Sequence, residues 1–138
     1  MKQMKDRCFI DSNICLYLLG DDMVKKNIAK EILLFDSCIS TQVLNKNINI
    51  IFKKFKTIPF AGLKGHIAIL VKHNLIVGID TNTINQALFI KEKYQLQWYD
   101  SLIISSALQA NCKILFSEDM QHNLLVEKTL SIICCTLN

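Results

Sequence analysis

Short apolar segments alternate with longer amphipathic segments along this chain, and this alternation restricts the folds that it can adopt. The apolar segments have only three to five residues and little polar character on either face, as expected of strands inside a parallel sheet. The five expected strands are Cys8–Asp11, Cys38–Ser40, Leu75–Ile79, Lys113–Phe116 and Ser131–Cys134. The pattern predicts an α/β domain whose central parallel sheet of about five short strands is flanked by helices on both faces.

Amphipathic segments between these strands predict the helices. Their approximate ranges are 14–19, 23–34, 41–55, 63–73, 81–94 and 101–110. Ser40 or Thr41 is expected to cap the third helix, whose apolar stripe consists of Leu44, Ile48, Ile51, Phe52 and Phe55. Asp100 is expected to open the last helix, and Asn111 to follow its end.

Length and composition are those of one globular domain covering residues 1–138. Hydrophobic residues make up 51% of the chain, enough for a core without disulfide or metal support. The segment Met1–Arg7 is charged, and Asp11 and Asn13 interrupt the apolar stretch after it, so no signal peptide is expected. No run approaches the ~18 apolar residues of a membrane span. We therefore expect a cytoplasmic protein without a membrane partner.

Three carboxylates stand where the chain leaves expected strands or enters an expected helix. Asp11 and Asp119 follow strands, and the carboxyl ends of parallel strands border the functional crevice of such sheets. Each acid by itself also suits a helix cap or a turn: Asp11 and Asp100 as caps, Asp119 as a turn residue. Brought to one edge, three acids repel one another unless a cation neutralises them. Hard oxygen ligands select Mg²⁺ or Mn²⁺, which activate water against phosphodiesters.

Four segments together resemble the PIN-domain nucleases, and within them the small ribonuclease toxins of VapBC toxin–antitoxin pairs. These segments are Phe9–Ile14 (FIDSNI), Ser40–Asn45 (STQVLN), Tyr99–Ala107 (YDSLIISSA) and Leu115–His122 (LFSEDMQH). They span nearly the whole chain in the family's order. The resemblance implies a PIN-like nuclease domain, Mg²⁺- or Mn²⁺-dependent endoribonuclease activity on RNA, a homodimer and a cognate VapB-type antitoxin. Carried over by position, Asp11, Asp100 and Asp119 are the catalytic metal ligands, and Asn13 and Ser117 support them.

Lys46 departs from the resemblance, because the family pattern has a metal-site glutamate at this position. A solvated lysine is one interpretation, since Lys46 shares a helix face with Gln42, Asn49 and Lys53. The other is that its ammonium points toward the three aspartates and is held there by charge-assisted hydrogen bonds. An ammonium neutralises charge but cannot carry an activated water. We therefore expect a nuclease that is attenuated or inactive because of Lys46.

Two other function classes stay open. The first is a catalytically dead PIN domain that serves as a binding module for an antitoxin or RNA. The second, an unrelated phosphate-handling domain, lacks the glycine-rich loop that it would need. The net charge of +4, with fifteen lysines and one arginine, suits contact with a nucleic-acid backbone but also an ordinary solvated surface. Aromatic Trp98 and Tyr99 suit either base stacking or packing.

Overall fold

The computed structural model describes residues 6–135, so the first five residues of the charged N-terminal segment and residues 136–138 lie outside the described part. Its centre is a sheet of six strands in the order β3-β2-β1-β4-β6-β5. The strands are β1 (Cys8–Ile10), β2 (Ser37–Ser40), β3 (Leu75–Val77), β4 (Ile114–Ser117), β5 (Leu125–Val126) and β6 (Leu130–Cys134). Every neighbouring pair is parallel except β5 and β6, which are antiparallel.

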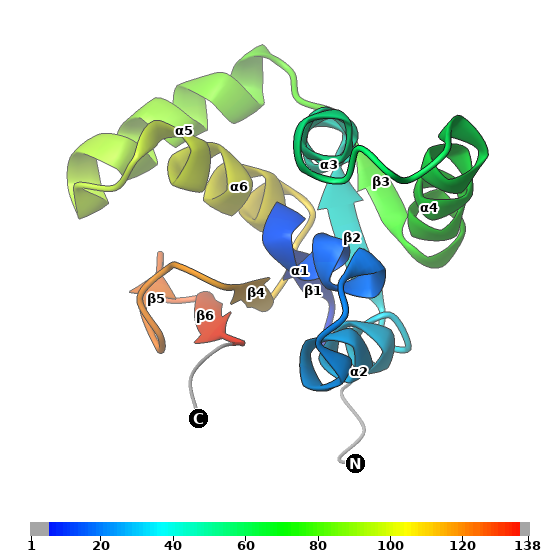
Figure 1. Ribbon diagram of the computed structural model, residues 1–138. Coiled ribbons are helices and arrows are strands. Elements are labelled where there is room, and N and C mark those ends of the chain that lie inside the picture. Colours follow the sequence, from blue (N-terminus) through cyan, green and yellow to red (C-terminus); the bar gives the residue numbers. More distant parts are fainter. Residues whose placement is uncertain (1–5, 136–138) are drawn as a thin grey trace.

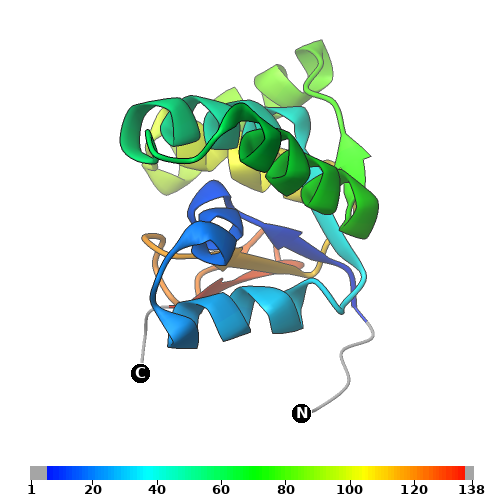
Figure 2. The same cartoon turned by 45° about the vertical axis from the view of Figure 1, so that its right-hand side comes forward.

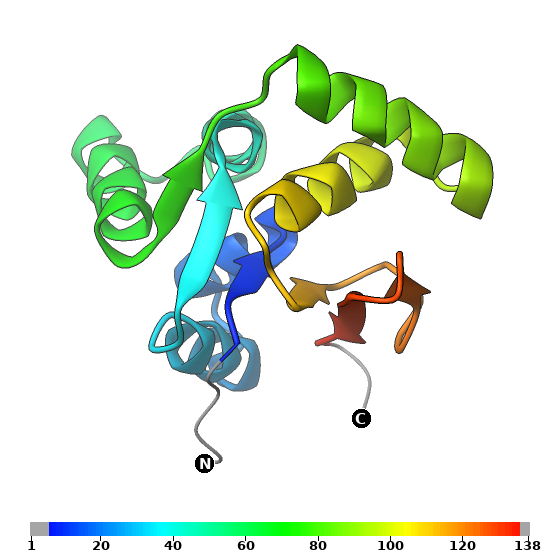
Figure 3. The same cartoon turned by 180° about the vertical axis from the view of Figure 1, so that it is seen from behind.

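Helices cover both faces of this sheet (Figure 1). They are α1 (Ser12–Leu16) with the 3₁₀ turn η1 (Tyr17–Leu19), α2 (Met23–Ile32), α3 (Thr41–Lys54), α4 (Phe60–His73), α5 (Thr81–Tyr94) and α6 (Trp98–Gln109). Helices α2 and α6 lie on opposite sides of the sheet (Figure 2), and α5 packs along α6 (Figure 3). The sequence-based prediction of an α/β domain with a mostly parallel sheet is confirmed.

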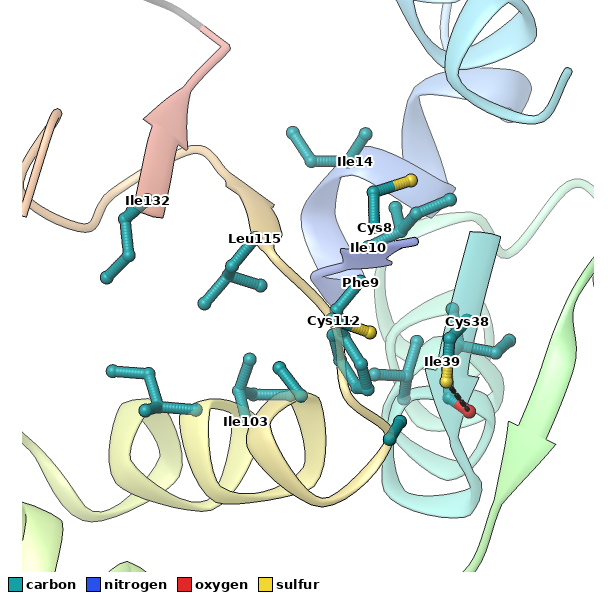
Figure 4. Close-up of a cluster of buried hydrophobic side chains, with 14 of the residues drawn as sticks. Cys8, Phe9, Ile10, Ile14, Cys38, Ile39, Ile103, Cys112, Leu115 and Ile132 are labelled. Carbon is teal, nitrogen blue, oxygen red and sulfur yellow. Dashed lines mark hydrogen bonds between the residues drawn. The ribbon is translucent and has the colours of Figure 1, made fainter. Parts of the chain in front are cut away.

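The main core lies between the central strands and the helices on each side. Phe9 of β1 and Leu115 of β4 are fully buried, with Ile14 of α1 on one side and Ile103 of α6 on the other (Figure 4). A smaller cluster of Leu16, Ile51 and Leu63 joins α1, α3 and α4. Four of the six cysteines are buried within these layers, where a free cysteine acts as a small hydrophobic residue.

Local differences from the expectations have simple causes. Strand β5 has only two residues, so it gives no recognisable apolar segment. Helix α6 begins at Trp98 with Gln97 as its N-cap, which places Asp100 inside the first turn instead of at the cap. Ser40 caps α3 as expected, and Asn111 has a left-handed φ of 59° just beyond α6.

The buried side of α3 also differs from the expected apolar stripe. Its buried residues are Val43, Asn47 and Ile51, whereas Phe52 is 55% exposed. Tertiary packing against α1 and α4 has rotated the buried side toward a position occupied by a polar residue. Within residues 6–135, none of the helices combines the length and the apolar character required to cross a lipid bilayer.

Candidate active site

Asp11 stands at the carboxyl end of β1 and is also the N-cap of α1. One of its carboxylate oxygens accepts a hydrogen bond from the backbone N–H of Ser12 at 2.7 Å. The other accepts a hydrogen bond from the hydroxyl of Ser117, at the end of β4, at 3.2 Å. The capping role and the site role therefore coincide in one side chain, whose two oxygens are held by two different elements.

The turn after β4 brings the second acid to the same edge. Strands β1 and β4 are adjacent and parallel, so the residues that follow them emerge together. The side-chain amide of Asn13, in α1, donates a hydrogen bond to Asp119 at 3.5 Å. Ser117 in turn accepts a hydrogen bond from the backbone N–H of Met120 at 3.3 Å, which fixes the turn carrying Asp119. Four of the expected site residues are thus linked in pairs by hydrogen bonds.

The third acid comes from the first turn of α6. Burial raises the pKa of Asp100, and the neighbouring charge of Asp119 raises it further. Burial also raises the pKa of Asp11, as does the charge of Asp100. An effect of one charge on the next requires Asp100 to lie near Asp11, and Asp119 to lie near Asp100. The structure therefore brings Asp11, Asp100 and Asp119 to one edge of the sheet, where each disfavours ionisation of a neighbour.

Lys46 of α3 faces the same cluster. Its positive charge lowers the pKa of both Asp11 and Asp100, although not enough to cancel the effect of burial. Among residues 6–135, no ion pair within 4.0 Å and no hydrogen bond joins Lys46 to an aspartate. Its ammonium lies 5.7 Å from the ring centroid of Tyr99, which is 61% exposed. The charge-assisted hydrogen bonds of the second interpretation are therefore not formed there. Lys46 is exposed, as the interpretation of a solvated lysine expects, and its ammonium makes a cation–π contact with Tyr99.

The donor chemistry of this cluster suits a hard divalent cation, since carboxylate and amide oxygens are the ligands of Mg²⁺ and Mn²⁺. The carboxylates are not, however, arranged around a single point at which a cation could bind. In the described part of the chain, no three His, Cys, Asp or Glu side chains are grouped closely enough to hold a metal ion. Lys46 supplies part of the positive charge that such a cluster needs. The donor types fit the metal, and the spacing of the three carboxylates beside Lys46 does not yet form a coordination site.

A second polar group joins α1, α3 and α4 next to Asp11 and Lys46 in the sequence, and it was not anticipated. The amide of Asn47, fully buried, donates hydrogen bonds to the backbone carbonyls of Ser12 at 3.3 Å and Val43 at 3.0 Å. Its oxygen lies 3.0 Å from Nε2 of His66, so the ring donates from that nitrogen. We call Ser12, Asn47 and His66 the buried polar link. The sequence signal for it is a polar residue spaced four positions from both Val43 and Ile51.

Comparison with models of known protein families assigns the chain to a family. The model of the PIN domain matches residues 8–125, most of the chain. The chain therefore belongs to the PIN domain family, in agreement with the resemblance found in its four segments. A search of curated protein sequences finds no match.

Several solved structures have a similar fold, and three of them are a toxin and two toxin–antitoxin complexes. VapBC2 from Rickettsia felis, bound to a DNA fragment from its promoter, is similar with 16% identity and a TM-score of 0.66 over 91% of this chain and 96% of that chain. A toxin–antitoxin complex from Klebsiella pneumoniae is similar with 14% identity and a TM-score of 0.63 over 81% and 86%. VapC20 of Mycobacterium tuberculosis, a sarcin–ricin loop cleaving toxin, has 12% identity and a TM-score of 0.61 over 81% and 91%. At these identities the likeness establishes the fold.

Proposed function

We propose that this chain is the toxin of a type II toxin–antitoxin pair, a metal-dependent endoribonuclease attenuated or inactivated by Lys46. The observation that carries the proposal is the meeting of Asp11, Asp100 and Asp119 from three separate elements at the carboxyl edge of a PIN-domain sheet. Burial and a neighbouring like charge raise the pKa of Asp11 and of Asp100, so ionisation of these two carboxyls destabilises the folded protein. Such a cluster is retained for chemistry more readily than for stability.

The three aspartates are the proposed ligands of Mg²⁺ or Mn²⁺. Asn13 orients Asp119, and Ser117 orients Asp11, each through the hydrogen bond already described. A divalent ion bound by these carboxylates supplies Lewis-acid activation of water and stabilises the charge on a phosphodiester under attack. The two supporting residues each hold one carboxylate oxygen, and the three carboxylates would have to draw closer together for a cation to bind.

Lys46 is the proposed cause of lowered activity. Its charge partly replaces that of a cation, because it already lowers the pKa of Asp11 and Asp100. An ammonium has no coordination position for water and cannot act as a Lewis acid. In this proposal the glutamate implied by the family pattern would add a fourth carboxylate and remove the competing cation at the same time.

Partners follow from the same proposal. An antitoxin segment of VapB type would lay an amphipathic helix in the groove of about 610 Å³ between α2 and α4, which is lined by Leu18, Leu33, Leu34 and Ile69 among others. Exposed Ile84, Leu88 and Phe89 of α5 offer an apolar surface for a homodimer. The proposed place of action is the cytoplasm, with RNA as substrate.

The test is cleavage of labelled transfer and ribosomal RNA in Mn²⁺ and in EDTA by this chain and by its Lys46→Glu variant. The proposal expects Mn²⁺-dependent cleavage by the variant and weaker or no cleavage by the starting chain. Lys53→Glu is the matched control, since it makes the same charge change on the same helix away from the acids. Equal cleavage by the starting chain and Lys46→Glu would exclude the role given to Lys46.

A second candidate function is a PIN domain that binds RNA or an antitoxin without cleaving RNA. The position of Lys46 beside the acids favours it, because a tethered cation stabilises the cluster without a metal. Absence of cleavage in both Lys46→Glu and the starting chain, with RNA binding intact, would select this candidate.

A further inference from the structure

A pocket of about 330 Å³, lined by Asn13 and Glu118 among others, adjoins the acidic cluster. It lies between α1 with η1, the start of α2, the end of α3 and the turn after β4. Its lining includes Leu16, Tyr17, Lys25, Lys54, Phe55 and Glu118. Asn13, which binds Asp119, also lines the pocket. The pocket and the acidic cluster are therefore parts of one continuous surface.

Three side chains brace one wall of this pocket. The hydroxyl of Tyr17 donates a hydrogen bond to Glu118, and the ammonium of Lys25 lies 3.9 Å from the same carboxylate. That ammonium is also 5.2 Å from the ring centroid of Tyr17. The charge of Glu118 is thus paired within the protein. Burial and the hydrogen bond to Glu118 raise the pKa of Tyr17. The wall is pre-organised before any ligand arrives.

The open ends of the pocket differ in charge. Lys54 lies at the end formed by α3, and in the described part of the chain it takes part in no ion pair. Asp21 and Asp22 lie at the end formed by the loop before α2, where Asp22 caps that helix by accepting from Val24 at 3.0 Å. A phosphate is attracted to the lysine end and repelled from the aspartate end. Groups carrying N–H donors have the opposite preference.

We propose that this pocket binds one ribonucleotide of a single-stranded RNA, next to the phosphodiester that lies at the acidic cluster. The inference rests on the proposed function for the position of that phosphodiester. The base contacts the apolar surface of Ile50 and Phe55 and directs N–H donors toward Asp21, while its phosphate contacts Lys54. The volume is at the small end of the about 300–1,000 Å³ found for ligand pockets, which suits one nucleotide. Such a subsite makes the chain select the nucleotide beside the reacting bond.

Binding of fluorescein-labelled hexaribonucleotides, measured by fluorescence anisotropy in EDTA at low salt, tests this subsite without any metal. Lys54→Glu repels the phosphate, and Lys53→Glu is its matched control because Lys53 is adjacent, equally charged and absent from the pocket lining. Gly20→Phe fills the pocket without changing its charge, and Gly20→Ala is the control. A side chain is tolerated at Gly20, since a Cβ there meets its nearest atom at an ordinary 3.8 Å.

The subsite predicts that Lys54→Glu and Gly20→Phe each raise the Kd for RNA about tenfold, the size expected from the loss of one bound base. Each control should change it less than about threefold. Equal effects of Lys53→Glu and Lys54→Glu with no effect of Gly20→Phe would overturn the proposal, as would no RNA binding by the starting chain. A free nucleoside monophosphate that binds as tightly as the hexamer would overturn the assignment to an RNA chain.

Cleavage by Lys46→Glu separates this inference from the proposed function. If that variant fails to cleave RNA while Lys54→Glu and Gly20→Phe still weaken binding, the nuclease assignment fails and the subsite stands. If Lys46→Glu cleaves RNA but the pocket variants bind like their controls, the nuclease stands and the subsite is overturned.

Discussion

Two polar clusters share the junction of α1 and α3, and they are built on opposite principles. In the buried polar link, Asn47 has its amide and its oxygen satisfied by uncharged hydrogen-bond partners. The acidic cluster contains the sequence neighbours of these residues, because Asp11 precedes Ser12 and Lys46 precedes Asn47. Asp11 and Lys46 stand among further charges, and no ion pair within 4.0 Å joins them. The first arrangement lowers the free energy of the folded chain. The second raises it at neutral pH, because burial and like charge oppose ionisation.

The difference separates the residues that stabilise the fold from those that are proposed to carry the function. The buried polar link fixes α1 against α3 and so determines where Asp11 and Lys46 face each other. The acidic cluster can then remain short of positive charge without unfolding the helices that carry it. The charged cluster therefore lies beside a neutral group of residues whose hydrogen bonds are made.

The largest expected effect comes from removing the centre of the buried polar link. Asn47→Ala leaves the Ser12 carbonyl and the His66 ring without their partner, and we expect a loss of about 3 kcal/mol in the free energy of unfolding. Urea denaturation measures it. Asn49→Ala, exposed on the same helix, should change stability by less than about 0.5 kcal/mol. Equal effects at both positions would remove the contrast between the clusters.

A smaller effect is expected from acid. Burial lowers the pKa of His66 from 6.5 to about 4, so the folded state resists a proton that the unfolded chain accepts. The stability from the neutral ring is complete above about pH 6.5 and is lost as the pH falls toward 4. Between pH 8 and pH 5 this amounts to about 2 kcal/mol.

Urea denaturation at both pH values checks this prediction. His66→Gln keeps a donor near Asn47 but does not titrate, and its stability should fall by about 2 kcal/mol less over the same interval. An identical pH dependence in both proteins would contradict the assignment.

The smallest effect concerns the acidic cluster. Lys46→Gln removes the charge that lowers the pKa of Asp11 and Asp100, so both pKa values should rise. Since the folded-state values are already raised, the variant should lose more stability than the starting chain as the pH rises through about 4 and above. Carboxyl titration by NMR measures the two pKa values directly. Lys53→Gln should leave both unchanged, and a shift of equal size there would mean that the effect is general.

Much of this contrast could be anticipated from the sequence. Strands β1 and β4 are continuous apolar segments, so the edge at which Asp11 and Asp119 emerge follows from the rule that carboxyl ends of parallel strands align. Asp100 could be placed only through the resemblance, because it lies within a helical turn and not after a strand. The family match to residues 8–125 agrees with that resemblance.

Other features depend on packing that a sequence does not display. Asn47 and Asn49 are the same residue type on one helix, and only the contact with His66 makes the first a buried anchor. The resting place of the Lys46 ammonium over Tyr99 is set by the rotamers of a long side chain. The pocket beside Asn13 is lined by three separate segments of the chain, within 13–25, within 50–55 and at Glu118, so no local sequence pattern predicts it.

The most direct test of the account is Mn²⁺ binding measured by calorimetry for the starting chain, Lys46→Glu and Lys46→Glu combined with Asp100→Asn. We expect Lys46→Glu to bind Mn²⁺ at least about tenfold more tightly than the starting chain, and the added Asp100→Asn change to remove this gain. Equal Mn²⁺ affinity in the starting chain and Lys46→Glu would contradict the claim that these aspartates form a metal site held in check by one lysine.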